Sequence, residues 1–221
     1  MNNNDYIIRL ETKNDYSEVE NLTREAFWNV YKPGADEHYF VHVMRDHEDF
    51  LPELAFVLEK DGRIIGNIMY TKSKLTDENG EEKTIVSFGP ISVHPDFQRM
   101  GYGKILIEHS FAKAAELGYD AVVHFGNPGN YMARGYKSCK KYNVCLDNGE
   151  GGVYPTALLV KELTEGFFDG RKWFFCESNV AEPCNDADAV AAFDAQFPYK
   201  EKLVTPSQEE FYIYSHSQVV F

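Results

Sequence analysis

A strand that passes into a helix through two glycines is the feature that most constrains this sequence. Residues 84–93 read as a strand, Pro95 interrupts the chain just beyond it, and Gly101 and Gly103 open a segment with helical apolar spacing. A helix that begins in this way leaves its first main-chain amides without partners, and its dipole favours an anion there. Because glycine has no Cβ, a phosphate can approach closely. The sequence therefore predicts a loop suited to a pyrophosphate.

Three other types of turn contain such glycines, and two of them fail here because a required residue is missing. A plain strand-to-helix turn that happens to contain glycine is the simplest alternative, and a Gly-x-Gly pair alone does not exclude it. A Rossmann fingerprint needs a third glycine where this chain has Leu106. A P-loop needs Ser or Thr after its lysine, and Lys104 is followed by Ile105.

The spacing of five residues in this segment is similar to the acyl-CoA signature of the GNAT N-acetyltransferase superfamily, Val-x-Pro-x-x-Gln-x-x-Gly-x-Gly. The matching residues are Val93, Pro95, Gln98, Gly101 and Gly103. The resemblance implies that the loop amides bind the CoA pyrophosphate and that the strand end pairs with the pantetheine arm as an extra strand would. The CoA-binding residues expected on this basis are Ile91, Ser92, Val93, Gln98, Arg99, Met100, Gly101, Tyr102, Gly103, Lys104 and Asn127.

A second match follows at the spacing that the family requires. Residues 122–128 resemble the family's next strand and its exit, and residues 131–136 resemble its Tyr-x-x-x-Gly-Phe motif, with Tyr136 in place of Phe. The resemblance implies that Tyr131 is the general acid that protonates the departing thiolate, and a phenol is apt because it is protonated at neutral pH. The alternative is that Tyr131 has a structural role, with its ring packed against neighbours and its hydroxyl group hydrogen-bonded. The flanking residues most resemble the YhbS-like branch of the family, over about residues 6–163.

The general base is less visible. His124 ends the strand expected beside the acetyl group, and the ordinary pKa of histidine, about 6.5, suits a base; a structural histidine is the alternative. Glu25, Glu37 and His38 are candidates for the acceptor side, as the first two helices usually line it in this family. The expected mechanism is a ternary complex with direct attack of a neutral amine on the thioester and an oxyanion held by a main-chain amide near Val93.

Composition narrows the range of partners. The 221 residues carry a formal net charge of −13, from 35 acidic against 22 basic residues, which opposes nucleic acid and anionic membranes and mildly favours amines. No apolar run is long enough to span a bilayer and no secretory leader is recognisable, so we expect a cytoplasmic protein. The four cysteines form no Cys-x-x-Cys pair, so we expect no metal.

The pattern of elements predicts an α+β fold with a mixed, mostly antiparallel central sheet flanked by helices and splayed at the acyl-CoA site. Strands are expected at residues 6–11, 54–59, 63–74, 84–93, 120–125, 136–146 and 157–163, and helices at 15–28, 36–45, 101–117 and 130–134. Asp61-Gly62 predicts a tight hairpin. We expect residues 1–163 to form the catalytic domain and the aromatic-rich residues 164–221 to form an extension packed on it. That extension is expected to contain a short helix at 186–193 and an edge strand at 211–214. It could pair two copies as a homodimer or cap the acceptor cleft.

These observations favour an acetyl-CoA-dependent N-acetyltransferase that acts on a primary amine of a small molecule or peptide. A non-catalytic acyl-CoA-binding or regulatory module on the same fold remains an alternative, because no base is obvious. A dinucleotide-dependent oxidoreductase is a third possibility, which the missing third glycine disfavours.

Overall fold

The structure is a computed structural model that describes residues 5–220. It contains two compact units, each assembled from three separate stretches of chain. The first unit comprises Met1–Tyr70, Gly89–Lys113 and Asn179–Gln208, and the second comprises Thr71–Phe88, Ala114–Ser178 and Glu209–Phe221. Residues beyond 163 thus contribute to both units.

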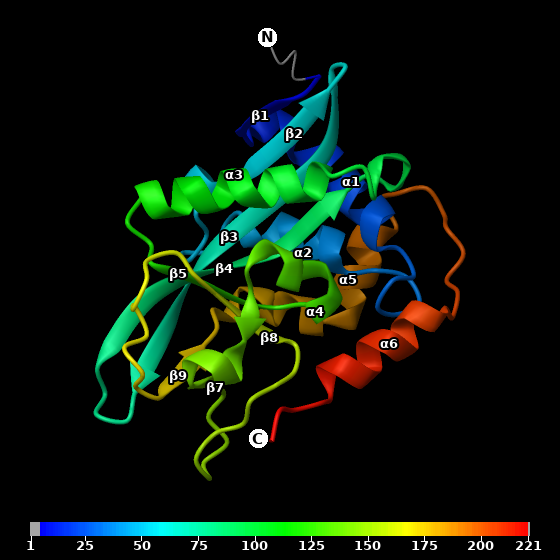
Figure 1. Ribbon diagram of the computed structural model, residues 1–221. Coiled ribbons are helices and arrows are strands. Elements are labelled where there is room, and N and C mark those ends of the chain that lie inside the picture. The colour runs from blue at the N-terminus through cyan, green and yellow to red at the C-terminus, as the bar shows by residue number, and fades with distance from the viewer. Residues whose placement is uncertain (1–4, 221) are drawn as a thin grey trace. The chain divides into compact units, whose positions relative to one another are not determined.

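The strands of the first unit begin with a meander (Figure 1). β1 (Ile7–Leu10) pairs antiparallel with β2 (Phe56–Lys60), and β2 pairs antiparallel with β3 (Arg63–Asp77), whose first half lies in this unit. Asp61 and Gly62 both have positive φ, 51° and 76°. A two-residue hairpin turn with that geometry matches the twist of its strands, so the predicted hairpin is confirmed.

Two helices cover these strands with apolar faces. Helix α1 (Tyr16–Phe27) packs Val19 and Leu22 against Val57 and Ile64. Helix α2 (Glu37–Met44) packs its apolar side chains into a second cluster, which contains Val41, Met44, Ala55, Met69 and Val180. Both helices were expected, at residues 15–28 and 36–45.

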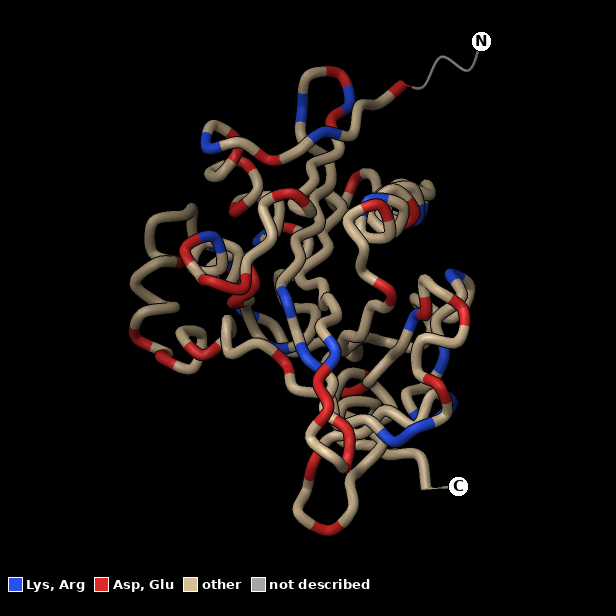
Figure 2. The backbone as a smooth tube through the Cα atoms, turned by 90° about the vertical axis from the view of Figure 1, so that its left-hand side faces the viewer, with Lys and Arg blue, Asp and Glu red and all other residues tan. Residues whose placement is uncertain are grey.

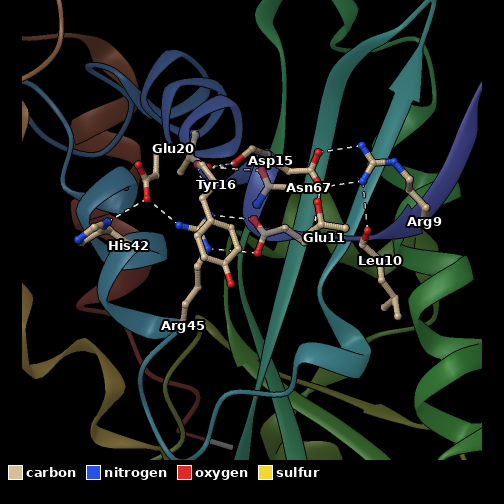
Figure 3. A network of polar contacts seen from close by, with 12 residues as sticks. Arg9, Leu10, Glu11, Asp15, Tyr16, Glu20, His42, Arg45 and Asn67 are labelled. Carbon is tan, nitrogen blue, oxygen red and sulfur yellow. Dashed lines mark hydrogen bonds and ion pairs between the residues drawn. The ribbon is translucent and has the colours of Figure 1, made fainter.

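A buried ion network fixes α1 and α2 to the end of β1 (Figure 3). The Arg45 side chain is 4% exposed; it donates to Glu11 at 2.8 Å and to Glu20 at 2.6 Å, and its guanidinium carbon lies 3.9 Å from the Tyr16 ring centroid. His42 lies 3.0 Å from the same Glu20 carboxylate. Pulling Arg45 away from Glu11 or Glu20 would leave a buried charge unpaired. The cost of that separation restricts how the two helices can move.

The second unit holds the rest of the sheet. It contains the far halves of β3 and of β4 (Glu82–Val93), together with β5 (Ala121–Phe125), β6 (Lys137–Ser138), β7 (Val144–Cys145), β8 (Leu158–Glu162) and β9 (Trp173–Cys176). β4 pairs with β5, and β7 with β9, in parallel; β5 with β8, β6 with β8, and β3 with β9 are antiparallel. Trp173, fully buried, donates to the Phe168 carbonyl at 2.9 Å in the core of this unit. The predicted mixed, mostly antiparallel sheet is confirmed.

Helix α3 (Tyr102–Glu116) begins where the paired glycines predicted and ends before Gly118, whose φ is 86°. The left-handed conformation of that glycine is the usual way in which a helix terminates. The short helical segment expected at 130–134 is present as α4 (Pro128–Tyr131) followed by a 3₁₀ turn, Met132–Arg134.

Two expectations for the later part of the chain need correction. The strand expected at 136–146 is reduced to the two-residue strands β6 and β7, because a 3₁₀ turn, Cys139–Tyr142, separates them and Asn143 adopts a φ of 54°. The edge strand expected at 211–214 is wrong, because those residues lie in helix α6 (Pro206–Ser215). Proline at the first helical position favours a helix start, and this signal outweighs the β-forming aromatic residues.

The helix expected at 186–193 is confirmed as α5 (Ala187–Asp194). The Asp186 side chain accepts hydrogen bonds from the amides of Asp188 and Ala189, both at 3.0 Å, which caps the helix start. Strand β9 was not predicted.

Candidate functional site

The loop that joins β4 to α3, residues 94–104, is called the phosphate loop below. After β4 ends at Val93, the 3₁₀ turn Pro95–Phe97 follows, and the His94 ring accepts a hydrogen bond from the Asp96 amide at 3.2 Å. The Gln98 side chain donates to the Val93 carbonyl at 3.0 Å. The signature glutamine therefore ties the loop back to the end of its own strand.

The amides of residues 99–104 are open to a ligand. The first amide of α3 that donates along the helix is that of Ile105, which reaches the Gly101 carbonyl at 3.1 Å. Within residues 5–220, the preceding six amides donate to no protein acceptor. Unpaired amides at the start of a fifteen-residue helix form an anion site, and the dipole adds to it.

Backbone conformation in the phosphate loop explains its glycines. Gly101 has a φ of 94° and Arg99 a φ of 62°, so the chain turns through the left-handed region twice. A Cβ at Gly101 would meet no atom within 4 Å, whereas one at Gly103 would lie 3.5 Å from a Val93 methyl. Conformation, and not protein packing, is therefore what demands glycine at position 101.

The end of β4 offers its main chain to a ligand. Ser92 is 1% exposed, and its hydroxyl donates to Thr23 Oγ1 at 3.2 Å, inside the first unit. Thr23 in turn donates to Asn67 Oδ1 at 3.4 Å. Since the Ser92 side chain is used internally, a ligand that pairs with Ile91, Ser92 or Val93 would do so through backbone atoms, as the resemblance implies.

In the second unit the pairing of β4 with β5 is brief. Val86 of β4 lies opposite Val122 of β5 in the pairing. At the next residue along each strand, the buried Ser87 hydroxyl donates to the Val123 carbonyl at 2.6 Å, in place of a main-chain donor. Because β4 and β5 are paired through their main chains at this one register position, the two strands are free to diverge beyond it.

His124 lies at the end of β5 in a group of rings, called the aromatic cluster below and formed by Phe88, His124, Tyr131 and Tyr136. The His124 ring centroid is 4.1 Å from that of Phe88, 4.5 Å from Tyr131 and 4.8 Å from Tyr136. His124 is 2% exposed, and burial lowers its pKa to about 3. Neither ring nitrogen has a hydrogen-bond partner within residues 5–220. The imidazole is therefore neutral at physiological pH.

Gly126 makes room for the aromatic cluster. A Cβ at this position would lie 2.6 Å from Tyr131 Cε2 and 3.0 Å from His124 Nε2. The exit from β5 thus runs directly against the two residues predicted to carry catalysis, and any side chain at position 126 would displace Tyr131. The structure brings His124 and Tyr131 together, a contact that the sequence did not predict.

The Asn127 side chain is already engaged. Its oxygen accepts from the Gly129 amide at 2.9 Å, which caps α4, and its nitrogen donates to Glu210 Oε1 at 3.0 Å. A contact between CoA and this side chain would require one of these bonds to exchange.

The three acceptor-side candidates differ in their surroundings. Glu25 accepts from Lys200 at 2.8 Å. Burial, reinforced by the neighbouring Asp36 charge, raises the pKa of Glu37 to about 7. His38 is fully buried with Nε2 at 3.1 Å from Asp194 Oδ1, and burial lowers its pKa. Glu37 thus has the protonation behaviour expected of a base near neutral pH.

Three further residues, Arg24, Asp194 and Phe197, gather in the first unit and were not expected from the sequence. The Arg24 guanidinium carbon lies 5.4 Å from the Phe197 ring centroid, and Arg24 Nε donates to Asp194 at 2.7 Å. A gap of 170 residues separates the ion-paired residues, and no local pattern marks either one.

Charged residues occur along most of the described backbone, with Lys and Arg interspersed among the more numerous Asp and Glu (Figure 2). Helices long and apolar enough to cross a bilayer do not occur within residues 5–220. Nor does that part of the chain hold three or more His, Cys, Asp or Glu side chains grouped as metal ligands would be.

A family model for the acetyltransferase (GNAT) family matches residues 20–139, more than half of the 221-residue chain. The chain therefore belongs to the GNAT family of acetyltransferases.

Among its relatives, the uncharacterized N-acetyltransferase YhbS of Escherichia coli K12 is 26% identical over 161 residues, 72% of this chain and 91% of YhbS. The crystal structure of E. coli YhbS in complex with CoA has a TM-score of 0.66 at 22% identity and covers 80% of this chain and 92% of its own. The crystal structure of a GNAT family acetyltransferase from Brucella melitensis in complex with acetyl-CoA has a TM-score of 0.60 at 22% identity. It covers 79% of this chain and 97% of its own. At these identities the structures establish the shared fold.

Proposed function

We propose that this protein transfers an acetyl group from acetyl-CoA to a primary amine of a small molecule or peptide, by direct attack within a ternary complex. The observation that carries the proposal is the run of six unpaired amides at residues 99–104, at the start of α3. Family membership and the CoA and acetyl-CoA bound in the two similar structures support the choice of donor. In this proposal residues 1–163 supply the donor site, and residues 164–221 complete the acceptor side.

In the proposed reaction the phosphate loop holds the diphosphate, and the main chain of residues 91–93 aligns the pantetheine arm. A neutral amine attacks the thioester carbonyl, and the developing oxyanion is stabilised by a main-chain amide near the end of β4. The C–S bond then breaks, and Tyr131 donates its phenolic proton to the thiolate. The attacking nitrogen loses one proton to a base or to water as the amide forms, and Tyr131 regains a proton from solvent.

The low pKa of His124 bears on its role. An imidazole whose conjugate acid has a pKa of about 3 is a weak base, so it would remove a proton from an ammonium group inefficiently. We therefore assign His124 to positioning Tyr131 within the aromatic cluster. Glu37, with a pKa of about 7, is the better candidate for a base in the first unit.

The test is acetyl-CoA consumption with a panel of amines, run beside calorimetric titration with CoA. Turnover with at least one amine supports the transferase. CoA binding without turnover on any amine would favour the non-catalytic module. Thermal stabilisation by NAD but not by acetyl-CoA would favour the oxidoreductase. Gel filtration with light scattering decides whether the protein is a homodimer.

A further inference from the structure

A cleft of about 540 Å³ lies in the first unit, between α1 and residues 194–202. Its lining includes Arg24 from α1 and Asp194, Phe197, Lys200 and Lys202 from the later segment. Glu201 from the same segment also lines it, so three cationic side chains face two acidic ones. Because Lys200 is also paired with Glu25, the charges around the cleft balance, and its capacity for an anion depends on how the individual side chains are placed.

Arg24 forms a built anion site within this cleft. Its side chain is 2% exposed, and Nε donates to Asp194 Oδ1 at 2.7 Å. Its guanidinium carbon lies 4.2 Å from the Trp28 ring centroid and 5.4 Å from that of Phe197. Within residues 5–220, the two terminal nitrogens, Nη1 and Nη2, make no hydrogen bond. Both nitrogens lie at an edge of the guanidinium that reaches solvent, so that edge can bond an acceptor that enters the cleft.

The other charged groups of the cleft are held in ways that leave that edge available. Asp194 Oδ1, the oxygen that Arg24 contacts, also lies 3.1 Å from His38 Nε2, although neither ring nitrogen of His38 makes a hydrogen bond within residues 5–220. Lys200 is paired with Glu25 at 2.8 Å. Trp28 donates to the Glu201 carbonyl at 2.9 Å, which fastens the later segment to α1. The guanidinium is therefore oriented before any ligand arrives.

A planar fork of two N–H groups matches the two oxygens of a carboxylate. We propose that this cleft binds the carboxylate of the acyl acceptor, so that the acceptor belongs to the amino acids or to peptides recognised by their C-terminus. The inference rests on the proposed acetyltransferase function and specifies its substrate class. The Arg24 fork holds the acceptor carboxylate, and the cleft encloses the adjoining part of the molecule.

Helix α1 joins this cleft to the donor strand. Thr23, the residue before Arg24, accepts a hydrogen bond from the buried Ser92 hydroxyl of β4 at 3.2 Å. Ser92 belongs to the main-chain segment assigned to the pantetheine arm. A carboxylate bound at Arg24 is thus held by the same helix that contacts the thioester strand, which is suited to bringing acceptor and donor together.

The first experiment compares substrates on the unaltered protein. Each of the common amino acids is assayed beside its carboxamide, which keeps the amine and removes the charge. We expect kcat/KM for the best amino acid to exceed that for its amide by about 100-fold. The amide lacks the charge that the site bonds, so the guanidinium would be left without its partner. Dipeptides form a second arm, which distinguishes free amino acids from peptide C-termini. Equal rates for acids and amides would overturn the inference.

The second experiment uses Arg24→Lys, which keeps the positive charge and removes the fork. We expect the preference for acids over amides to fall at least about 10-fold while the affinity for CoA, measured by calorimetry, is unchanged. Arg9→Lys is the matched control, because it removes a guanidinium bonded to Asp15 and Glu59 in the same unit but does not line the cleft. Weaker CoA binding in Arg24→Lys would show that the anion is a phosphate of CoA and overturn the inference.

A binding measurement separates this inference from the proposed function. N-acetylated amino acids are titrated into the CoA complex by calorimetry, without turnover. If no amine is acetylated but these acids bind, and Arg24→Lys binds them at least about 10-fold more weakly, the cleft assignment stands and the transferase proposal fails. If amines are acetylated regardless of a carboxylate, the transferase stands and the cleft assignment fails.

Discussion

Asn127 connects the start of α4 to the C-terminal helix: its side-chain nitrogen donates to Glu210 Oε1 at 3.0 Å while its oxygen caps α4 through the Gly129 amide at 2.9 Å. Tyr131 is the last residue of α4. The C-terminal segment, whose role the sequence left open, therefore supports the helix that carries the proposed general acid. This relationship lies wholly within the second unit.

We predict that Glu210→Ala lowers kcat on the order of 10-fold with little change in KM for acetyl-CoA, because Asn127 loses one of its two anchors and α4 holds Tyr131 less firmly. Unfolding free energy should fall by no more than about 1 kcal/mol, as the bond is exposed. Glu210→Gln retains an acceptor oxygen and should recover most of the loss. Equal kcat values in all three proteins would remove Glu210 from this role.

Tyr131→Phe should lower kcat by about 100-fold, since the variant keeps the ring contacts of the aromatic cluster and loses the acidic proton. The affinity for CoA should not change, because the phosphate loop belongs to the other unit. Steady-state kinetics and calorimetry measure the two effects. As a control, Tyr142→Phe removes a hydroxyl from a tyrosine outside the aromatic cluster; a loss as large as that of Tyr131→Phe would contradict the assignment.

Gly101→Ala should weaken CoA binding by about 10-fold, because a φ of 94° is strained for alanine and the loop amides would turn from the phosphates. Gly80→Ala is the matched control, since Gly80 has a φ of 82° and, like Gly101, open space where a Cβ would stand. Both variants should lose about 1 kcal/mol of stability. Comparable CoA affinity in the two would contradict the loop assignment.

Local signals explain what could be predicted. Asp61-Gly62 determines its turn through backbone conformation alone, and the phosphate loop follows from a strand end, a proline and two glycines within a dozen residues. In each case the information lies within one or two adjacent elements.

Long-range partnerships explain what could not be predicted. Arg24 occurs in a helix whose pattern shows only an apolar face, and its ion-pair partner Asp194 comes from a segment with weak periodicity. Residues 211–214 have β-forming side chains, yet the start of α6 at Pro206 determines their conformation. The pKa values of buried groups likewise depend on the neighbours that the fold places around them, and these neighbours cannot be predicted from a local sequence pattern.

His124 should make stability fall as the solution is acidified. Its pKa is about 3 in the folded protein against an ordinary value of 6.5, so the unfolded chain binds the proton more readily between those values. The contribution is fully present above pH 6.5 and is lost toward pH 3, up to roughly 5 kcal/mol. His124→Leu should therefore lose less stability than the natural protein between pH 6.5 and 4, measured by urea denaturation. Parallel curves for the two proteins would contradict the burial argument.

Glu37 should have the opposite effect. Its pKa is about 7 when folded against an ordinary 4.5, so the folded protein holds the proton more tightly, and the stabilising contribution is complete below pH 4.5 and is lost as the pH rises through 7. Glu37→Gln cannot ionise. We expect it to match the natural protein near pH 4.5 and to exceed it by about 1–3 kcal/mol at pH 8.

Glu48→Gln is the control for this comparison, because it removes the same charge from an exposed position. The pH dependence of Glu37→Gln is measured relative to this variant. If Glu37 is also the base, kcat of the natural protein should rise with pH through about 7, whereas Glu37→Gln should be slow at every pH. A variant that gains stability at pH 8 but keeps full activity would assign Glu37 to the fold and leave the base elsewhere.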